Sequence, residues 1–358
     1  MSKHLKIMLS GGGSGGPVTP LLAVAKELHT HQPETDFVFV GSHNGPEKTL
    51  VLESSKSIPI TFIPISSGKL RRYLSWKNFT DIFNIGGAFF QSIYILKKEK
   101  PSLVMSAGAF VSVPLVWAAK LLNIPVLIHQ QDVRPGLANR LMASAAKIIS
   151  VTFEDSLHDY GAKAVVTGNP FICPALENRE AVFKEYNLDL SRPLVLIFGG
   201  ATGATAINEA VAVNLDELLK FTQIIHVSGD GKINSASKFG YFVAEFLPYQ
   251  KLISVMTVAD LIVARAGLAT ITELSALKKP SILVPIVNTQ QEDNAKMLSD
   301  RKATLVLSQT ELNDKLTNEV KDLLNSDNKQ QELITNISVL NKPGAAGRIA
   351  DLALSLIK

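Results

Sequence analysis

Cysteine is nearly absent from the chain, and long apolar runs are absent altogether. Cys173 is the one cysteine among 358 residues, which excludes a disulfide within the chain and a metal site built on several thiolates. A lone cysteine fits a reducing compartment. No apolar run approaches the roughly 18 residues that a membrane-spanning helix needs, and the first residues lack a cleavage-site pattern. We therefore expect neither a membrane span nor a signal peptide.

The chain also has little excess of charge of either sign. The formal net charge is +4 at pH 7, whereas a nucleic-acid-binding protein usually carries a dense basic stripe. The histidines show no metal-ligand spacing, and no Asp-x-Asp pattern is present to hold a divalent metal on a nucleotide diphosphate. We therefore expect no nucleic-acid partner, no metal and no cofactor. Charge on a leaving phosphate would then be met by helix ends and backbone N–H groups.

Apolar residues, by contrast, are plentiful and regularly placed. They make up 46% of the chain, enough for an ample core, and the length favours two domains. Strand-like runs alternate with helical stretches throughout, which predicts βαβ units and parallel sheets in an α/β fold. The expected strands are at 5–10, 37–40, 60–64, 103–105, 126–129, 147–151, 194–198, 223–227, 261–264 and 281–285. The turn-rich segment Val166–Pro170 marks the predicted domain boundary.

One arrangement occurs twice: an apolar strand that leads into a glycine cluster and then a helix-like stretch. The clusters are Gly11–Gly16 and Gly199–Ala204. Glycine allows a tight turn and a close approach of the backbone to a ligand. A helix that begins after such a turn presents free N–H groups and a positive dipole end to an anion. The repetition predicts two nucleotide-fold halves that face each other across a cleft.

The first cluster matches the dinucleotide fingerprint G-x-G-x-x-G through Gly11, Gly13 and Gly16. An NAD site also needs an acidic residue at the end of the second strand, but this strand ends Val40-Gly41-Ser42. The Lys-Ser/Thr of a phosphate-binding P-loop is missing as well. The cluster therefore predicts a close-approach turn. A turn without any ligand, and an NAD dehydrogenase, are the alternatives.

The segment Arg265–Glu273 follows the strand at 261–264. We expect Gly267 to supply an unusual backbone angle and Thr270 to cap the first helical turn. About one turn into the helix, the Glu273 carboxylate could accept two hydrogen bonds from a ribose diol, while the helix start binds phosphates. The alternative is a glutamate that only complements the helix dipole.

Two further polar segments follow strands, where open α/β sheets bind ligands. Asn288–Asn294 is rich in amides, which both donate to and accept from sugar hydroxyls. His129 and Asp132, in His-Gln-Gln-Asp, are candidates for a general base. The alternatives are a solvated loop for the first segment and a histidine that binds local backbone for the second.

A basic stretch with aromatic residues, Lys69–Lys77, precedes an amphipathic segment that Lys97, Lys98 and Lys100 close. Basic flanks around aromatic and aliphatic residues suit an anionic membrane surface, so the 69–100 region is our candidate for membrane contact. The alternative is a helix that faces the core with solvated ends.

In their order, these segments resemble the MurG-type N-acetylglucosaminyltransferases of bacterial peptidoglycan synthesis, which have the GT-B fold. The resemblance covers nearly the whole chain. The matching stretches are 12–16 with Pro20, 69–73, 108–112, 129–132 with Gly136 and Asn139, 166–170, 199–204 with Asn208, Glu245-Phe246, 265–273 and 290–295.

The resemblance implies two Rossmann-like domains, an acceptor and membrane-side domain at 1–168 and a UDP-sugar domain at 169–342, with a helix at 343–358 that packs back on the first. It implies transfer of N-acetylglucosamine from UDP-N-acetylglucosamine to undecaprenyl-pyrophosphoryl-MurNAc-pentapeptide (lipid I), which gives lipid II with inversion. The implied place is the cytoplasmic face of the bacterial plasma membrane, with no metal.

The resemblance also implies roles for single residues. Leu268–Glu273 match the segment that binds donor diphosphate and ribose, and Leu247 matches a residue whose backbone meets uracil. Gln290 and Gln291 match residues that contact the transferred sugar. The segment 14–16 matches the first glycine loop, which faces the acceptor and the donor sugar. The candidate substrate-binding set is Ser14, Gly15, Gly16, Asn139, Gly200, Leu247, Arg265, Gly267, Leu268, Ala269, Thr270, Glu273, Gln290, Gln291 and Asn294.

Several positions depart from the family pattern. They are Pro17 for a histidine, Gln130 and Asp132 for Glu and Asn, Ile172 for an arginine, Ala201 for a serine, and Ala107-Gly108-Ala109 for Lys-Gly-Gly. Because Pro17 cannot accept a proton, Asp132 is our candidate base and His129 the second. A glycosyltransferase with another lipid acceptor, or a non-catalytic descendant that binds nucleotide sugar, stays open as an alternative.

Overall fold

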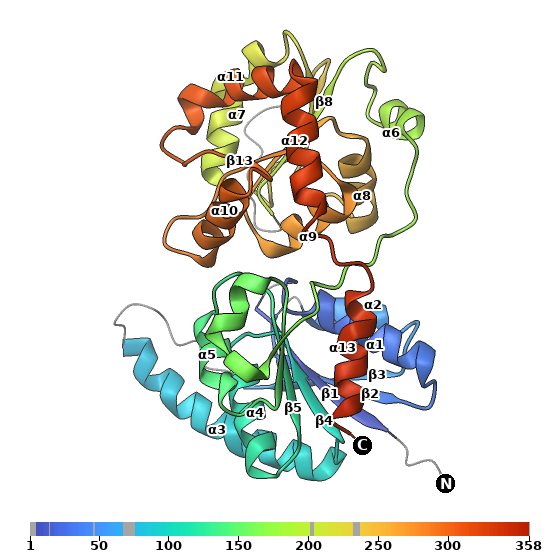
Figure 1. The fold of residues 1–358 in the computed structure, drawn as a ribbon, viewed down its shortest axis with the longest axis vertical. Coiled ribbons are helices and arrows are strands. Elements are labelled where there is room, and N and C mark those ends of the chain that lie inside the picture. The colour runs from blue at the N-terminus through green and yellow to red at the C-terminus, as the bar shows by residue number, and fades with distance from the viewer. Residues whose placement is uncertain are drawn as a thin grey trace. The chain divides into compact units, whose positions relative to one another are not determined.

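The chain consists of two α/β domains (Figure 1). The computed structural model describes residues 5–13, 15–45, 47–66, 76–200, 204–231 and 237–357, without the side chains of 76–85. We call Met1–Phe171 with Lys342–Lys358 the N-terminal domain and Ile172–Asn341 the C-terminal domain. The boundary between the domains therefore falls after Phe171, whereas the boundary expected from the sequence was after residue 168.

The N-terminal domain holds a seven-stranded parallel sheet in the order β3-β2-β1-β4-β5-β6-β7. Chain order reverses beside β1, which is the switch point where such sheets bind ligands. The strands are β1 (Lys6–Ser10), β2 (Asp36–Ser42), β3 (Ile60–Ile65), β4 (Leu103–Ser106), β5 (Val126–Gln130), β6 (Ile148–Val151) and β7 (Ala164–Val166). The helices are α1 (Thr19–His31), α2 (Glu47–Ser54), α3 (Trp76–Glu99), α4 (Ser112–Leu121), α5 (Leu137–Ala143) and α13 (Ala345–Ser355), with 3-10 turns at Glu154–Asp159 and Gly161–Lys163.

Both faces of this sheet are covered, which explains its continuous apolar strands. Along β2, Phe37 and Phe39 lie in a core shared with α1 and α13, while Val38 and Val40 lie in a second core shared with α4 and α5. The alternation follows from the two-residue period of a strand.

The C-terminal domain holds a six-stranded parallel sheet in the order β10-β9-β8-β11-β12-β13, with its switch point beside β8. The strands are β8 (Leu194–Phe198), β9 (Gln223–Val227), β10 (Tyr241–Ala244), β11 (Leu261–Ala264), β12 (Ser281–Leu283) and β13 (Leu305–Val306). The helices are α6 (Arg179–Glu185), α7 (Thr205–Leu218), α8 (Tyr249–Val258), α9 (Leu268–Leu277), α10 (Gln290–Asp300), α11 (Leu312–Leu324) and α12 (Asp327–Ser338). The prediction of an α/β fold with two Rossmann-like domains is confirmed.

The last helix belongs to the first domain. Figure 1 shows α13, in red, beside α1, in blue, and the two helices are in contact. Ile349, Ala350 and Ala353 are buried in the core of the N-terminal sheet. The Arg348 guanidinium donates to the Thr167 carbonyl from both Nε (3.0 Å) and Nη2 (2.7 Å). The N-terminal domain is therefore completed by residues that follow the C-terminal domain in the chain.

Candidate active site

In the C-terminal domain, the turn between β11 and α9 leaves the start of a helix uncapped. Gly267 is the N-cap residue, and α9 has no side-chain cap. Ile271 N donates to Gly267 O (3.0 Å), so the amides of the three residues before it point out of the helix start. These amides and the positive end of the helix dipole form a place for an anion.

Two local predictions for this turn are wrong. Thr270 does not cap the helix, because it is the third helical residue and lies inside the first turn, beyond the N-cap position. Gly267 has φ −74°, an angle that any residue adopts, so the turn does not need a glycine for its backbone angle.

Glu273 lies in the second turn of α9 and is 7% exposed. Burial raises the pKa of its carboxyl group to about 7, and a hydrogen bond from the Tyr249 hydroxyl partly offsets that rise. Tyr249 begins α8, and its own pKa is raised by burial and by the charge of Glu273. A carboxylate in this setting is a strong acceptor for hydroxyl groups.

Arg265 supports the turn from within. Its side chain is buried, and Nη1 donates to the carbonyl of Val284 (3.0 Å) while Nη2 donates to Gln309 Oε1 (3.0 Å). Asn294, on α10, donates to the carbonyl of Ala266 (3.2 Å). Two residues predicted to bind substrate therefore hold the 265–267 backbone in place.

The start of α10 lies beside the start of α9, because β11 and β12 are adjacent strands of the sheet. Thr289 caps α10 by accepting from Gln291 N (3.2 Å), and Gln290 is the first helical residue. Gln291 Oε1 accepts from Ile286 N (3.1 Å), and Gln291 Nε2 is 3.8 Å from where a Cβ on Gly267 would lie. The structure thus brings Gln291, one of the two predicted sugar-binding amides, next to the predicted phosphate site.

The remaining donor-site candidates flank this group. Leu247 is buried between β10 and α8, two residues before Tyr249, whose hydroxyl contacts Glu273. Gly200 follows β8 with φ +87°, a left-handed angle that favours glycine, and a Cβ there would meet no atom within 4 Å. Ala201, one of the departures from the family pattern, lies outside the described residues.

In the N-terminal domain, His129 is fully enclosed. Its Nε2 donates to Asn169 Oδ1 (2.9 Å), and its Nδ1 lies 2.9 Å from the Ser150 hydroxyl. Burial lowers the pKa of the imidazole to about 4, so the ring is neutral at physiological pH. Both nitrogens are occupied, which suits a structural contact better than proton transfer.

Gln130 explains one departure from the family pattern. Its Nε2 donates to the carbonyls of Asp132 (2.7 Å) and Arg134 (3.1 Å), and its Oε1 accepts from Asn139 (2.6 Å) and from the Tyr160 hydroxyl (2.9 Å). A glutamate in this geometry would turn a carboxylate oxygen toward two carbonyls. The amide therefore suits this loop, and Asn139 is a buried part of the same network.

Asp132 lies next to the first glycine loop. It is half-buried, and its neighbour Gln131 donates from Nε2 to the carbonyl of Gly16 (2.9 Å). Gly15 O accepts from the amides that open α1, those of Val18 (3.0 Å) and Thr19 (3.1 Å). Ser14 lies outside the described residues. The structure thus places Gln131, the residue before the candidate base, against the first glycine loop.

Sequence reasoning missed Glu47 and Tyr249. Glu47, the first residue of α2, accepts from the amides of Ser42 (2.7 Å) and Gly13 (3.2 Å). The glycines that flank it at positions 41 and 45 were the available signal. For Tyr249 there was none, because its contact with α9 depends on how two helices pack. Among the described residues, no cluster of His, Cys, Asp and Glu is arranged to hold a metal ion.

Both domains of the chain match a known protein family. The glycosyltransferase family 28 N-terminal domain matches residues 7–151, and the C-terminal domain of that family matches residues 194–349. The UDP-N-acetylglucosamine--N-acetylmuramyl-(pentapeptide) pyrophosphoryl-undecaprenol N-acetylglucosamine transferase of Clostridium botulinum strain Langeland is 40% identical over 318 residues, which cover 87% of this chain and 88% of the relative.

The transferase of the same name from Clostridium botulinum strain Alaska E43 is 36% identical over 362 residues, 99% of this chain and 98% of the relative. The crystal structure of Acinetobacter baumannii MurG superposes with a TM-score of 0.74 at 26% identity, and the match covers 98% of this chain and 99% of that one. These matches set the dehydrogenase alternative aside. The chain belongs to glycosyltransferase family 28, among the MurG-type N-acetylglucosaminyltransferases.

Proposed function

We propose that this chain transfers N-acetylglucosamine from UDP-N-acetylglucosamine to lipid I and so makes lipid II. The observation that carries the proposal is the pairing of the uncapped start of α9 with the buried carboxylate of Glu273. One is suited to a diphosphate and the other to the hydroxyls of a ribose. The names of the relatives supply the donor and the acceptor.

In this proposal the C-terminal domain binds the donor. The amides of Leu268, Ala269 and Thr270 bind the diphosphate, and their fixed dipoles stabilise the charge that develops on UDP as it leaves. Glu273 accepts hydrogen bonds from the ribose. The backbone of Leu247 contacts uracil, and the amides at 290 and 291 contact the transferred sugar.

The N-terminal domain binds the acceptor and takes up its proton. The 4-hydroxyl of the muramoyl sugar attacks the anomeric carbon on the face opposite UDP, so the configuration inverts. Asp132 accepts the hydroxyl proton as the new bond forms. It is preferred over His129 because the imidazole is enclosed and its two nitrogens already have partners.

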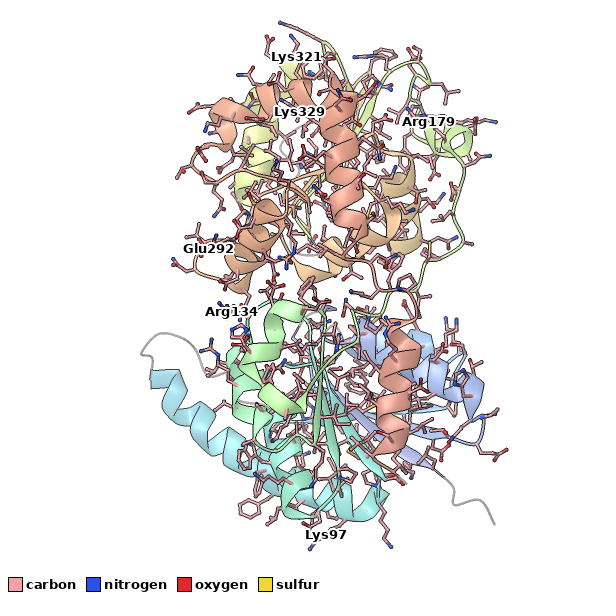
Figure 2. The ribbon with its side chains drawn as sticks, viewed as in Figure 1. Lys97, Arg134, Arg179, Glu292, Lys321 and Lys329 are labelled. Carbon is pink, nitrogen blue, oxygen red and sulfur yellow. The ribbon has the colours of Figure 1, made fainter. Side chains whose placement is uncertain are left out.

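The membrane surface we propose lies on α3 and α4. Phe90, Tyr94 and Leu121 are 71%, 67% and 62% exposed, so these two helices present apolar side chains to solvent. Exposed lysines accompany them at 97, 98 and 120, and Figure 2 shows Lys97 pointing away from the ribbon. Apolar rings beside cations favour an anionic leaflet such as the cytoplasmic one. Residues 69–75 of the predicted 69–100 region lie outside the described residues.

Two measurements test the catalytic proposal. Calorimetry should show binding of UDP-N-acetylglucosamine in the absence of magnesium and weaker binding of UDP-glucose. A single-turnover assay should then show transfer to a lipid I analogue above background. Failure to bind any UDP-sugar would refute the proposal, and transfer only to a different polyprenyl acceptor would favour the alternative acceptor.

Vesicle flotation tests the membrane surface. Phe90→Ser with Tyr94→Ser should reduce recovery with phosphatidylglycerol vesicles, while wild-type protein should show little affinity for phosphatidylcholine alone. Val213→Ser is the matched control, because Val213 is 71% exposed on α7 of the other domain. Equal recovery of the double variant and the control would contradict the assignment. Among the described residues, no helix is long and apolar enough to cross a bilayer.

A further inference from the structure

The first glycine loop encloses a carboxylate that belongs to the chain itself. Glu47 is fully buried at the start of α2. Its Oε1 accepts from the Ser42 amide (2.7 Å) and from the Ser42 hydroxyl, and its Oε2 accepts from the Gly13 amide (3.2 Å). The side chain therefore links the end of β2 to the loop that follows β1.

The surrounding glycines are needed for this carboxylate to fit. A Cβ on Gly12 would lie 2.6 Å from Glu47 Oε1, and a Cβ on Gly41 would lie 2.8 Å from Glu47 Cγ. A Cβ on Gly45 would also overlap the carboxylate. Because such overlaps require the side chain to move, glycine at these positions leaves room for Glu47 and not for an external ligand.

Glu47 thus supplies a carboxylate to the Gly13 amide of the glycine loop, upstream of the start of α1. Its negative charge disfavours a phosphate at the Gly13 amide. The later part of the loop remains for substrate, and it is coupled to the candidate base, because Gln131 donates to the carbonyl of Gly16 (2.9 Å) and precedes Asp132.

We propose that Glu47 is a positioning residue for the acceptor: it holds the Gly12–Gly13 backbone so that the end of the loop at Gly15–Gly16, and with it Asp132, is placed for the acceptor hydroxyl. This inference rests on the proposed function. It predicts that changes at Glu47 impair the use of the lipid acceptor and leave donor binding nearly intact, because the contacts proposed for UDP come from residues of the C-terminal domain.

Glu47→Gln is the sharpest test. The amide oxygen of glutamine can keep both Ser42 contacts, but the amide nitrogen then faces the Gly13 N–H as a second donor. We expect kcat/KM for a lipid I analogue to fall about tenfold or more, the change that corresponds to loss of one hydrogen bond to a charged group. The Kd of UDP-N-acetylglucosamine, measured by calorimetry, should stay within about twofold.

Two further variants show whether a loss of activity comes from the contact between Glu47 and Gly13. Ser42→Ala removes a contact to Oε1 and leaves the Gly13 contact, so its kcat/KM should change less than about threefold, as for a partly redundant hydrogen bond. Glu47→Asp keeps the charge but is too short to reach both partners, so it should show the same split as Glu47→Gln. If circular dichroism shows that Glu47→Gln does not fold, Glu47→Asp is the variant that decides the test.

The outcomes separate this inference from the proposed function. Unchanged kcat/KM in both Glu47 variants would overturn the inference while wild-type transfer upheld the function. An equal loss of donor affinity would also overturn it, because that pattern indicates general damage. If the wild-type chain transferred no sugar, the proposed function would fall first and this inference with it.

Discussion

Neither α1 nor α9 has a side-chain cap, but in the loop before α1 the amide of Gly13 is bound to the carboxylate of Glu47. Both turns follow a central strand of a parallel sheet. The difference shows that a strand–glycine–helix turn does not by itself predict an anion site. What matters is whether the chain has already supplied a partner for the amides.

The two buried glutamates make the same contrast. Glu47 receives hydrogen bonds from two backbone amides and a serine hydroxyl of its own domain. Glu273 receives one from a tyrosine hydroxyl, and burial raises its pKa to about 7. We interpret the first as a structural anion and the second as an acceptor kept for a ligand.

The largest effect is expected from Asp132→Asn. If Asp132 is the base, kcat should fall by about 10²-fold or more, the usual contribution of a positioned general base. Donor affinity should not change, because the residue lies in the other domain. Steady-state kinetics with a lipid I analogue measure the first and calorimetry the second. Asp351→Asn, at an exposed position of α13, is the matched control. Turnover near the wild-type rate would rule Asp132 out.

Glu273→Gln should weaken donor binding with little effect on the N-terminal domain. Loss of a charge-assisted hydrogen bond to the ribose corresponds to roughly a 10- to 100-fold rise in the Kd of UDP-N-acetylglucosamine. Calorimetry measures it, and Glu180→Gln, at an exposed position of α6, serves as the control. An unchanged Kd would remove Glu273 from the donor site and end the contrast with Glu47.

Donor binding should also depend on pH. If Glu273 binds the ribose, the hydroxyls donate to its ionised form, whose pKa is about 7, so affinity should rise with pH. Between pH 6 and pH 8 the ionised fraction grows about tenfold, and the Kd should fall by a similar factor. His129 and His226, with pKa values lowered to about 4, stay neutral over this range. A flat profile in the wild type, or a sloping one in Glu273→Gln, would contradict this.

The stability of the C-terminal domain should change with pH in the opposite direction to donor affinity. Because the pKa of Glu273 is raised from 4.5 to about 7 in the folded state, the folded chain holds the proton more tightly than the unfolded chain does. The free energy of unfolding therefore decreases as the pH rises from 4.5 to about 7. Calorimetric scans across this range should show the decrease, and Glu273→Gln should lessen it.

The smallest effect is expected from two matched arginines. Arg348 donates to the Thr167 carbonyl (2.7 and 3.0 Å), and Arg192 donates to the carbonyls of Leu219 (2.7 Å) and Thr222 (2.9 Å). Replacing either with alanine should lower the unfolding free energy of its own domain by about 1–3 kcal/mol. Scanning calorimetry with and without UDP-N-acetylglucosamine should assign Arg192 to the transition that the ligand stabilises. If the two variants shifted the same unfolding transition by the same amount, the two domains would not unfold independently.

Much of the fold was predictable because its central strands are continuous apolar runs. The three strands that the sequence did not reveal, β7, β10 and β13, lie at sheet edges. They span only Ala164–Val166, Tyr241–Ala244 and Leu305–Val306, too short for a hydrophobic pattern to stand out. Short edge strands protect a sheet against pairing with other chains.

The site was predictable at the level of segments and less so at the level of side chains. The segments around Glu273 and Gln291 do lie together. Sequence reasoning did not reveal that Arg265 and Asn294 bind backbone carbonyls, because that depends on which carbonyls the folded loops turn toward them. Glu47 was missed for a similar reason: its partner Gly13 is distant in the chain and carries no side chain to signal the contact.

The position of α13 sets an order for folding during synthesis. The core between α1 and the N-terminal sheet lacks Ile349, Ala350 and Ala353 until the whole C-terminal domain has been translated. Domains commonly mature in the order in which they are made. Here the C-terminal domain has all its residues first, and the core of the domain that begins the chain stays incomplete until the last helix is made.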